Sequence, residues 1–216
     1  SVVSKFQPFA QMTPRELDEV VMLYITVGRQ GDIYEKVTKV AEGGGNGSPI
    51  IQFAHAKLAA SMGKADVVSR YLNTHGRDTE TAKLTQMFFI ANDRRQSAIA
   101  SQVAEFLYER EQSQTHREYL VSAYLRSGQY AKALPLVRDL HSTSRANEDS
   151  YLTTLMHLAK GNAENRNELN QYVSTQLANE EVPVERKLQL VFMMLNSGGK
   201  KEAIPYNDKY ANASPA

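Results

Sequence analysis

Apolar residues in this chain recur every three or four positions, the spacing that places them on one face of a helix. The pattern is clearest after Thr13, which occupies an N-cap position, with Pro14 at the first helical position and Glu16 at the capping-box position. The apolar stripe that follows consists of Leu17, Val20, Val21, Tyr24 and Val27. Alternating apolar and polar residues do not extend over any long stretch, so the sequence predicts an all-α fold.

Short polar steps interrupt the helical pattern at a regular interval. Each step follows an apolar helix end and precedes a second helix. Most steps contain a glycine: Gly31, Gly63, Gly128, Gly161 and Gly198. Asp93 takes the glycine position in a weaker copy. The successive intervals are 32, 30, 35, 33 and 37 residues, close to the tetratricopeptide period of about 34 residues.

One segment, REYLVSAYLRSGQYAKALPLV (117–137), resembles the tetratricopeptide consensus most closely. The matching positions are Leu120, Val121, Tyr124, Gly128, Tyr130 and Ala133. In the last copy, Gly198, Ala203 and Pro205 repeat the spacing of Gly128, Ala133 and Pro135. We expect both prolines early in a second helix, where a missing N–H costs least. Other copies depart from the consensus: Lys36 and Arg166 take the small-residue position, and His157 stands where tyrosine is usual.

The resemblance implies a right-handed α-solenoid of about six degenerate helix–turn–helix repeats. It would form a single superhelical domain over residues 1–216. The expected units cover residues 13–45, 48–76, 79–112, 114–144, 148–181 and 183–211. The alternative is an irregular helical bundle with helices of similar length.

The stretch AEGGGNGSPI (41–50) is the first candidate for chemistry. A phosphate-binding loop of this kind needs a preceding strand and a following lysine, and neither is present. Pro49 also removes a backbone donor that an anion would use. We interpret the stretch as a joint in which glycines end one helix, Ser48 caps the next and Pro49 begins it. Its excess of glycine also predicts mobility.

No other motif indicates catalysis, a metal or a cofactor. Ser61 and Lys64 form an S-x-x-K pattern, but the other elements of serine acyl enzymes are missing and Gly63 is the repeat turn. The histidines are His55, His75, His116, His141 and His157, and none shows a tight metal-ligand spacing. His55 and His157 lie within predicted helices and are expected to be packed or solvent-facing.

Composition removes further classes of function. The formal net charge is +1, which gives no electrostatic case for binding nucleic acid. The chain has no cysteine, so disulfides and thiolate sites are excluded. No apolar run approaches the roughly 18 residues that span a bilayer, so this segment is not expected to insert into a membrane. Because the chain starts at Ser1 rather than methionine, we expect it to be a processed form or an excised segment of a longer protein.

A solenoid of helix pairs presents a concave surface lined by the first helix of each pair. The residues expected to line it are Val21, Ile25, Arg29, Phe53, Lys57, Lys83, Met87, Glu118, Ser122, Arg126, Tyr151 and Leu155. Apolar anchors and mixed charges suit an extended peptide or a partner's loop. Tyr151, Phe53 and Arg126 should therefore face one surface. The lysine and asparagine clamp that tetratricopeptide co-chaperones use for a carboxylate is absent from the first two units.

The degenerate repeats, the glycine-rich joint and the absence of cysteine are similar to periplasmic scaffolds of bacterial exopolysaccharide export. LDEVVMLYITVGRQGDIYEKV (17–37) and YLRSGQYAKALPLV (124–137) look most like the Pel-type scaffold. The resemblance implies a non-catalytic periplasmic protein that recruits a polysaccharide-modifying enzyme and helps deliver polymer to an outer-membrane β-barrel during biofilm formation. Exposed aromatic residues could also stack on polysaccharide, although packing is their ordinary role. The alternatives are a cytosolic adaptor for a partner protein and, third, an enzyme with a helical fold.

Overall fold

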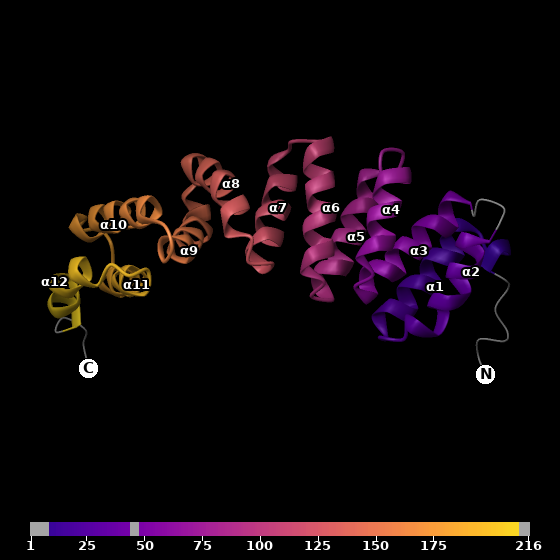
Figure 1. Cartoon of the computed structure of the whole chain (residues 1–216), viewed down its shortest axis with the longest axis horizontal. Helices are drawn as coiled ribbons and strands as arrows, with labels where there is room; N and C mark the ends of the chain where they lie inside the picture. Colours follow the sequence, from indigo (N-terminus) through magenta and orange to yellow (C-terminus); the bar gives the residue numbers. More distant parts are fainter. Residues whose placement is uncertain (1–8, 44–47, 212–216) are drawn as a thin grey trace. The chain divides into compact units, whose positions relative to one another are not determined.

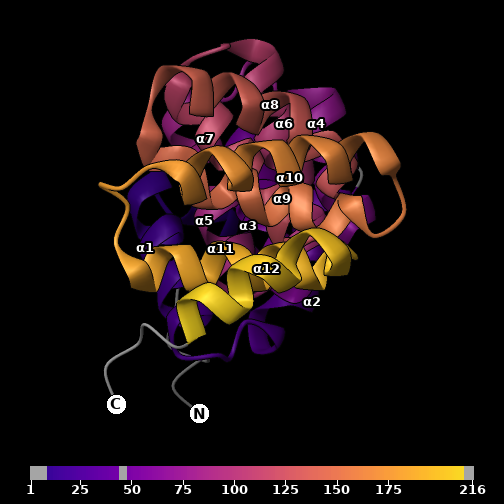
Figure 2. The same ribbon diagram turned by 90° about the vertical axis from the view of Figure 1, so that its left-hand side faces the viewer.

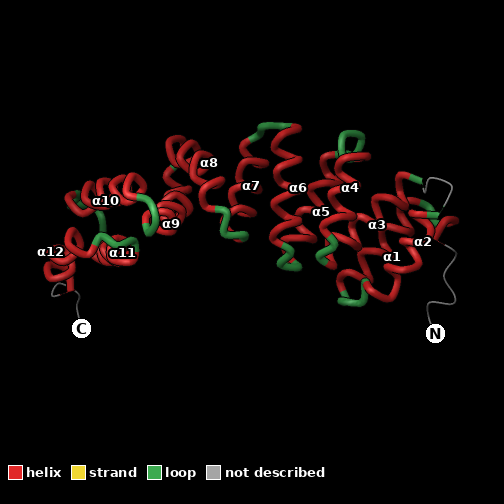
Figure 3. The backbone as a smooth tube through the Cα atoms, in the orientation of Figure 1, coloured by secondary structure: helices red, strands yellow, loops and turns green. Residues whose placement is uncertain are grey.

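The computed structural model describes residues 9–43 and 48–211, and this part of the chain contains twelve α-helices and no strand (Figures 1 and 3). The all-α prediction is confirmed. The helices are α1 (Pro14–Thr26), α2 (Gly31–Glu42), α3 (Pro49–Met62), α4 (Ala65–His75), α5 (Thr81–Asp93), α6 (Ser97–Arg110), α7 (Gln114–Arg126), α8 (Tyr130–Thr143), α9 (Glu148–Ala159), α10 (Ala163–Ala178), α11 (Val184–Asn196) and α12 (Lys200–Ala211). Two short 3-10 helices, η2 (Phe9–Gln11) and η3 (Arg145–Asn147), precede α1 and α9.

The predicted start of α1 is confirmed in detail. The Glu16 N–H donates to the Thr13 hydroxyl oxygen at 3.3 Å, and the Thr13 N–H donates to the Glu16 carboxylate at 2.8 Å. These two bonds form a capping box that satisfies N–H groups with no partner inside the helix. Pro49 likewise begins α3 after Ser48, but the Ser48 side chain makes no capping hydrogen bond.

Five of the helix-to-helix turns close in the same way. Four contain a glycine with positive φ, namely Gly28, Gly63, Gly128 and Gly198, and the turn after α5 uses Arg95 with φ 57°. In each turn the next residue donates its N–H to a carbonyl five residues back. These bonds are Arg29 to Tyr24 (2.8 Å), Lys64 to Ala59 (3.0 Å), Gln96 to Ala91 (2.8 Å), Gln129 to Tyr124 (2.8 Å) and Gly199 to Met194 (3.0 Å). This is the six-to-one bond of the Schellman motif.

The structure corrects two of the predicted turn residues. Gly31 is the first residue of α2, and the left-handed residue of that turn is Gly28. Asp93 is the last residue of α5, and Arg95 takes the left-handed conformation. The left-handed positions are then separated by 35, 32, 33 and 70 residues. The double interval arises because Gly161, in the turn between α9 and α10, does not have positive φ.

The corrected register brings equivalent residues to equivalent places. Five positions after each left-handed residue, the second helix has a residue at most 1% exposed: Ile33, Val68, Ala100, Ala133 and Ala203. Lys36 is exposed and does not occupy this position, contrary to the prediction. The turn therefore sets which face of the second helix packs inward.

The two repeated prolines lie later than predicted. Pro135 is the sixth residue of α8 and Pro205 the sixth of α12, so both are inside their helices. A proline there leaves the carbonyl four residues back without its helical donor. Both prolines are exposed, and so are Ala131 and Lys201, whose carbonyls lose the bond. Water can then replace the missing donor.

The chain forms two compact units, residues 1–123 and 124–216, and the boundary lies within α7. In the first unit, α3 contacts α1, α2, α4 and α5, and α6 contacts α4 and α5 (Figure 1). Ten of the fourteen residues of α3 are buried, because helices cover it on several sides. The predicted single domain over residues 1–216 stays a prediction.

In the second unit each helix packs on the next. Contacts join α8 to α9, α9 to α10, α10 to α11 and α11 to α12, and α9 also contacts α11. Figure 2 shows α11 and α12 side by side. The turn between α9 and α10 differs from the other five: Asn162 caps α10 through its side chain, which accepts from the Asn165 N–H at 3.1 Å. Arg166, at the predicted small-residue position, donates to the Ala159 carbonyl at 3.0 Å.

Two glycines of the second unit separate the effect of turn conformation from that of packing. A Cβ at Gly128 or Gly161 would meet nothing within 4 Å, but only Gly128 has a left-handed φ, +71°. We expect Gly128→Ala to lower the free energy of unfolding by about 1 kcal/mol, and Gly161→Ala to leave it nearly unchanged. Chemical denaturation followed by circular dichroism measures both. Equal losses would show that the left-handed turn has no special energetic role.

Candidate functional site

Most of the residues expected to line a concave groove are buried. Val21, Ile25, Phe53, Lys57, Met87, Tyr151 and Leu155 are each at most 8% exposed. Side chains this buried do not line an open groove along the first helices, so the prediction that these seven line one is corrected. Phe53 also borders the pocket described next. The apolar stripes of the first helices pack against neighbouring helices, and the sequence register selected that packed seam.

The other five predicted residues reach solvent. They are Arg29, Lys83, Glu118, Ser122 and Arg126. The expectation that Tyr151, Phe53 and Arg126 share one open face is not met, because the first two are buried and only Arg126 is exposed. That these five accessible residues contact a partner remains a prediction.

A pocket of about 400 Å³ lies in the first unit, between the N-terminal turns of α1 and α3, the first half of α5 and the α4–α5 connection. Its apolar lining comes from Leu17, Phe53 and Tyr71, with Ile50 at the rim. Its lining also includes the predicted groove residue Lys83. Phe53 and Lys83 therefore both line this pocket, whereas the sequence analysis placed them along a groove.

The wall formed by the α4–α5 connection is held by hydrogen bonds. The Tyr71 hydroxyl and the Thr79 hydroxyl lie 2.7 Å apart, and Thr79 donates to the His75 carbonyl at 2.8 Å. The Tyr71 ring packs between Phe53 and His75, with centroid distances of 6.0 and 5.4 Å. Burial raises the pKa of the Tyr71 phenol. The guanidinium of Arg110 binds the Thr79 carbonyl from outside the pocket.

A buried ion pair lies beside the pocket. Lys57 is fully buried, and its ammonium donates to the Asp18 carboxylate at 2.5 Å. The same ammonium lies 5.4 Å from the centre of the Phe53 ring. Burial lowers the pKa of Lys57, and Asp18 opposes that shift. The Asp18 side chain is 45% exposed and lines the pocket, so it connects the buried cation to the open space.

Two more acidic residues lie at the pocket edge. Glu80 pairs with Lys83 at 2.7 Å. Asp78 is exposed, and its carboxylate forms no hydrogen bond or ion pair with any residue that the structure describes. Asp78, Asp18 and Ile50 were not predicted from the sequence as site residues. The sequence predicted the helix starts at Pro14 and Pro49. It did not predict which first-turn residues lie together, because that depends on how α1, α3 and α5 pack.

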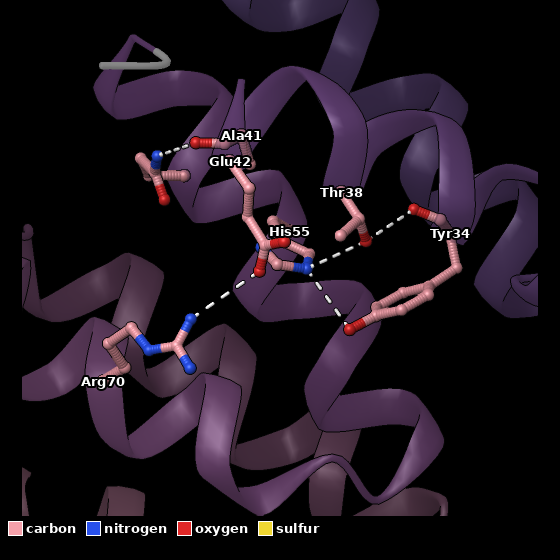
Figure 4. Close-up of polar contacts among 7 residues, drawn as sticks. Tyr34, Thr38, Ala41, Glu42, His55 and Arg70 are labelled. Carbon is pink, nitrogen blue, oxygen red and sulfur yellow. Dashed lines mark hydrogen bonds and ion pairs between the residues drawn. The ribbon is translucent and has the colours of Figure 1, made fainter. Parts of the chain in front are cut away.

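His55 forms a separate polar cluster between α2 and α3 (Figure 4). Its Nε2 atom lies 3.1 Å from the Thr38 hydroxyl and 3.2 Å from the Tyr34 hydroxyl. Beside it, Arg70 pairs with Glu42 at 3.6 Å. His55 is 4% exposed. These contacts join two hairpins, so of the two settings expected for His55, packed or solvent-facing, the structure shows the packed one.

Tyr151 belongs to a cluster in the second unit. Its hydroxyl donates to Glu168 at 2.8 Å, and Arg138 forms an ion pair with the same carboxylate. The His141 ring stacks on Tyr151 with centroids 4.7 Å apart. Burial, reinforced by Glu168, raises the pKa of Tyr151. The ring is therefore fixed in the packing of α8, α9 and α10.

Among the described residues, no three His, Asp or Glu side chains gather as metal ligands would. None of the helices in this part of the chain combines the length and apolar character needed to cross a membrane. The predicted mobility of the glycine-rich joint concerns residues 44–47, which lie outside the described residues. Gly43 ends α2, and Ser48 precedes α3.

Comparison of the chain with protein-family models, curated proteins and solved structures found no match.

The Lys57–Asp18 pair allows a test by double substitution. We expect Asp18→Ala to lower the free energy of unfolding by about 2 kcal/mol, because it leaves a buried ammonium without its partner. Lys57→Met should be close to neutral, because it replaces the charge by an apolar chain of similar length. Adding Lys57→Met to Asp18→Ala should restore most of the loss. Chemical denaturation of the four proteins measures this, and additive effects would contradict the pairing.

His55 gives the fold a dependence on pH. Burial is the main cause that holds the pKa of His55 below its usual value, and the nearby Glu42 opposes the shift. In the unfolded chain His55 takes up a proton as the pH falls below its ordinary pKa of about 6.5, whereas in the folded protein it stays neutral to a lower pH. Stability should therefore fall as pH drops from 7.5 toward 5. His55→Gln, which cannot titrate, should flatten this slope in denaturation curves measured across the range. An unchanged slope would contradict the assignment.

Proposed function

We propose that this chain is a non-catalytic helical-repeat scaffold that binds a partner protein, with the pocket between α1, α3 and α5 as the contact point. Five turns that share a residue in the left-handed conformation and the same closing hydrogen bond support a repeat built from helical hairpins. A right-handed tetratricopeptide-like solenoid is the arrangement that this repeat favours.

The pocket is the observation that supports binding. It combines an apolar floor with a few polar groups, which is the usual character of a recognition site. Ile50 at its rim is 37% exposed, although it is a large apolar side chain. A partner side chain in the pocket would cover Ile50 and gain contact with Phe53 and Tyr71. The volume of about 400 Å³ suits a short segment of a partner.

The biological setting that we propose is the periplasmic part of an exopolysaccharide export system. There the scaffold would recruit a polysaccharide-modifying enzyme and help deliver polymer to an outer-membrane barrel. The support is the resemblance of residues 17–37 and 124–137 to such scaffolds. A cytosolic adaptor with the same pocket is the alternative, and it differs in compartment and partner rather than in binding chemistry.

Capture by photo-crosslinking tests the proposal. A photoreactive amino acid at position 50 places the reactive group at the pocket rim, and one at Leu23, which is 55% exposed on α1, serves as the control. With periplasmic extract we expect one protein to crosslink from position 50 and not from position 23.

Capture of only cytosolic chaperones or transcription proteins would contradict the export setting. Equal crosslinking from both positions, or none from position 50, would contradict the pocket as the contact point.

A further inference from the structure

We infer that the pocket of the first unit selects a partner segment in which a lysine or arginine stands next to an apolar side chain. This inference rests on the proposed function and specifies the chemistry of the partner.

The apolar half of the ligand is indicated by the pocket floor. Leu17, Phe53 and Tyr71 line it and are 1%, 8% and 6% exposed. Pro14 and Ile50 extend the apolar surface to the rim. An aliphatic or aromatic side chain entering here removes its own surface and that of Ile50 from water, which is the main favourable contribution to such binding.

The charged side chains that line the pocket indicate that the other half of the ligand is a cation. Three carboxylates line the pocket, those of Asp18, Asp78 and Glu80, against one lysine, Lys83. Lys83 is already paired with Glu80, and the buried Lys57 is paired with Asp18. The Asp78 carboxylate has no partner among the described residues. Negative charge thus remains at the pocket edge, and it favours a cation while repelling an anion.

The position of Asp78 is fixed by its backbone. Its N–H donates to the His75 carbonyl at 3.1 Å. The next residue, Thr79, is tied to the Tyr71 hydroxyl at 2.7 Å, and Arg110 holds the Thr79 carbonyl. The carboxylate therefore projects from an ordered connection beside the apolar floor. A backbone held in place needs little reorganisation when its side chain meets a ligand.

An anionic ligand is the main competing possibility. The pocket is bordered by the first turns of α1, α3 and α5, whose N–H groups favour negative charge, and neither Ser48 nor Glu80 caps its helix through a side chain. However, Pro14 and Pro49 have no N–H to donate, and the capping box of Thr13 and Glu16 already occupies the start of α1. We therefore infer that the carboxylates at the pocket edge favour a cationic ligand over an anionic one.

Nuclear magnetic resonance titration of the full chain with isoleucine methyl labels tests the inference. The probe peptides are capped glycine-lysine-phenylalanine-glycine and two matched peptides, one with glutamate for lysine and one with serine for phenylalanine. We expect the lysine-phenylalanine peptide to shift the Ile50 methyl signal and to bind more tightly than either matched peptide. The buried Ile99, 2% exposed in α6, reports on nonspecific change.

Substitutions then assign the binding. We expect Asp78→Asn to weaken the lysine-phenylalanine peptide about two- to fivefold, the size of a partly exposed charge contact. Glu35→Gln, an exposed carboxylate on α2 outside the pocket, should leave binding unchanged. Ile50→Ser should weaken all peptides that contain phenylalanine. Asp78 and Ile50 are both exposed, so neither change is expected to unfold the chain.

Equal or tighter binding of the glutamate peptide, or an Asp78→Asn variant that binds like the parent, would overturn the inference. If none of the peptides binds but a partner still crosslinks from position 50, the inferred preference for a cation is wrong and the proposed scaffold function is retained. If both fail, the pocket is not a binding site.

Discussion

The hydrogen bond that closes five of the helical hairpins is the constraint on which much of this structure depends. A helix that reverses within a few residues leaves its last carbonyls without donors. A left-handed residue turns the chain so that the next N–H reaches the carbonyl five positions back, at 2.8 to 3.0 Å in five turns. Because the bond fixes the turn length, it also fixes the phase of the second helix, and a small or branched apolar residue reaches the interior at the same place each time.

Regular turns allow neighbouring hairpins to touch through their ends. A Cβ added to Gly63 would lie 2.6 Å from Oε1 of Gln96, which follows the left-handed residue of the next turn. The guanidinium of Arg94, in that same turn, donates to the Ile25 carbonyl at the end of α1. In the first unit these contacts hold one end of the hairpins together. The pocket lies at the N-terminal turns of α1 and α3, where side chains leave space beside Phe53 and Tyr71.

Local chemistry predicted the helices well because capping residues and apolar spacing act over a few positions. Thr13, Pro14 and Pro49 mark helix starts that the structure confirms. Glycine alone was a poor guide to the turn residue. In the first turn Gly28, not Gly31, has the left-handed conformation, and in the turn after α5 that conformation is taken by Arg95, which is not a glycine. Lys57 was assigned to the concave groove by the helix register, yet it is buried, and Asp18, 39 residues away in sequence, provides its partner. Such pairing, and the convergence of Asp18, Phe53 and Asp78 on one pocket, depends on packing between hairpins.

Amide hydrogen exchange resolved by residue tests the central claim most directly. The N–H groups of Arg29, Lys64, Gln96, Gln129 and Gly199 close the five turns. They should exchange at least about tenfold more slowly than unprotected turn amides, because a stable hydrogen bond must open before exchange. Slow exchange at all five positions would establish one repeated turn. Exchange of the Gln96 and Gln129 amides at the rate of an unprotected turn amide would contradict the account.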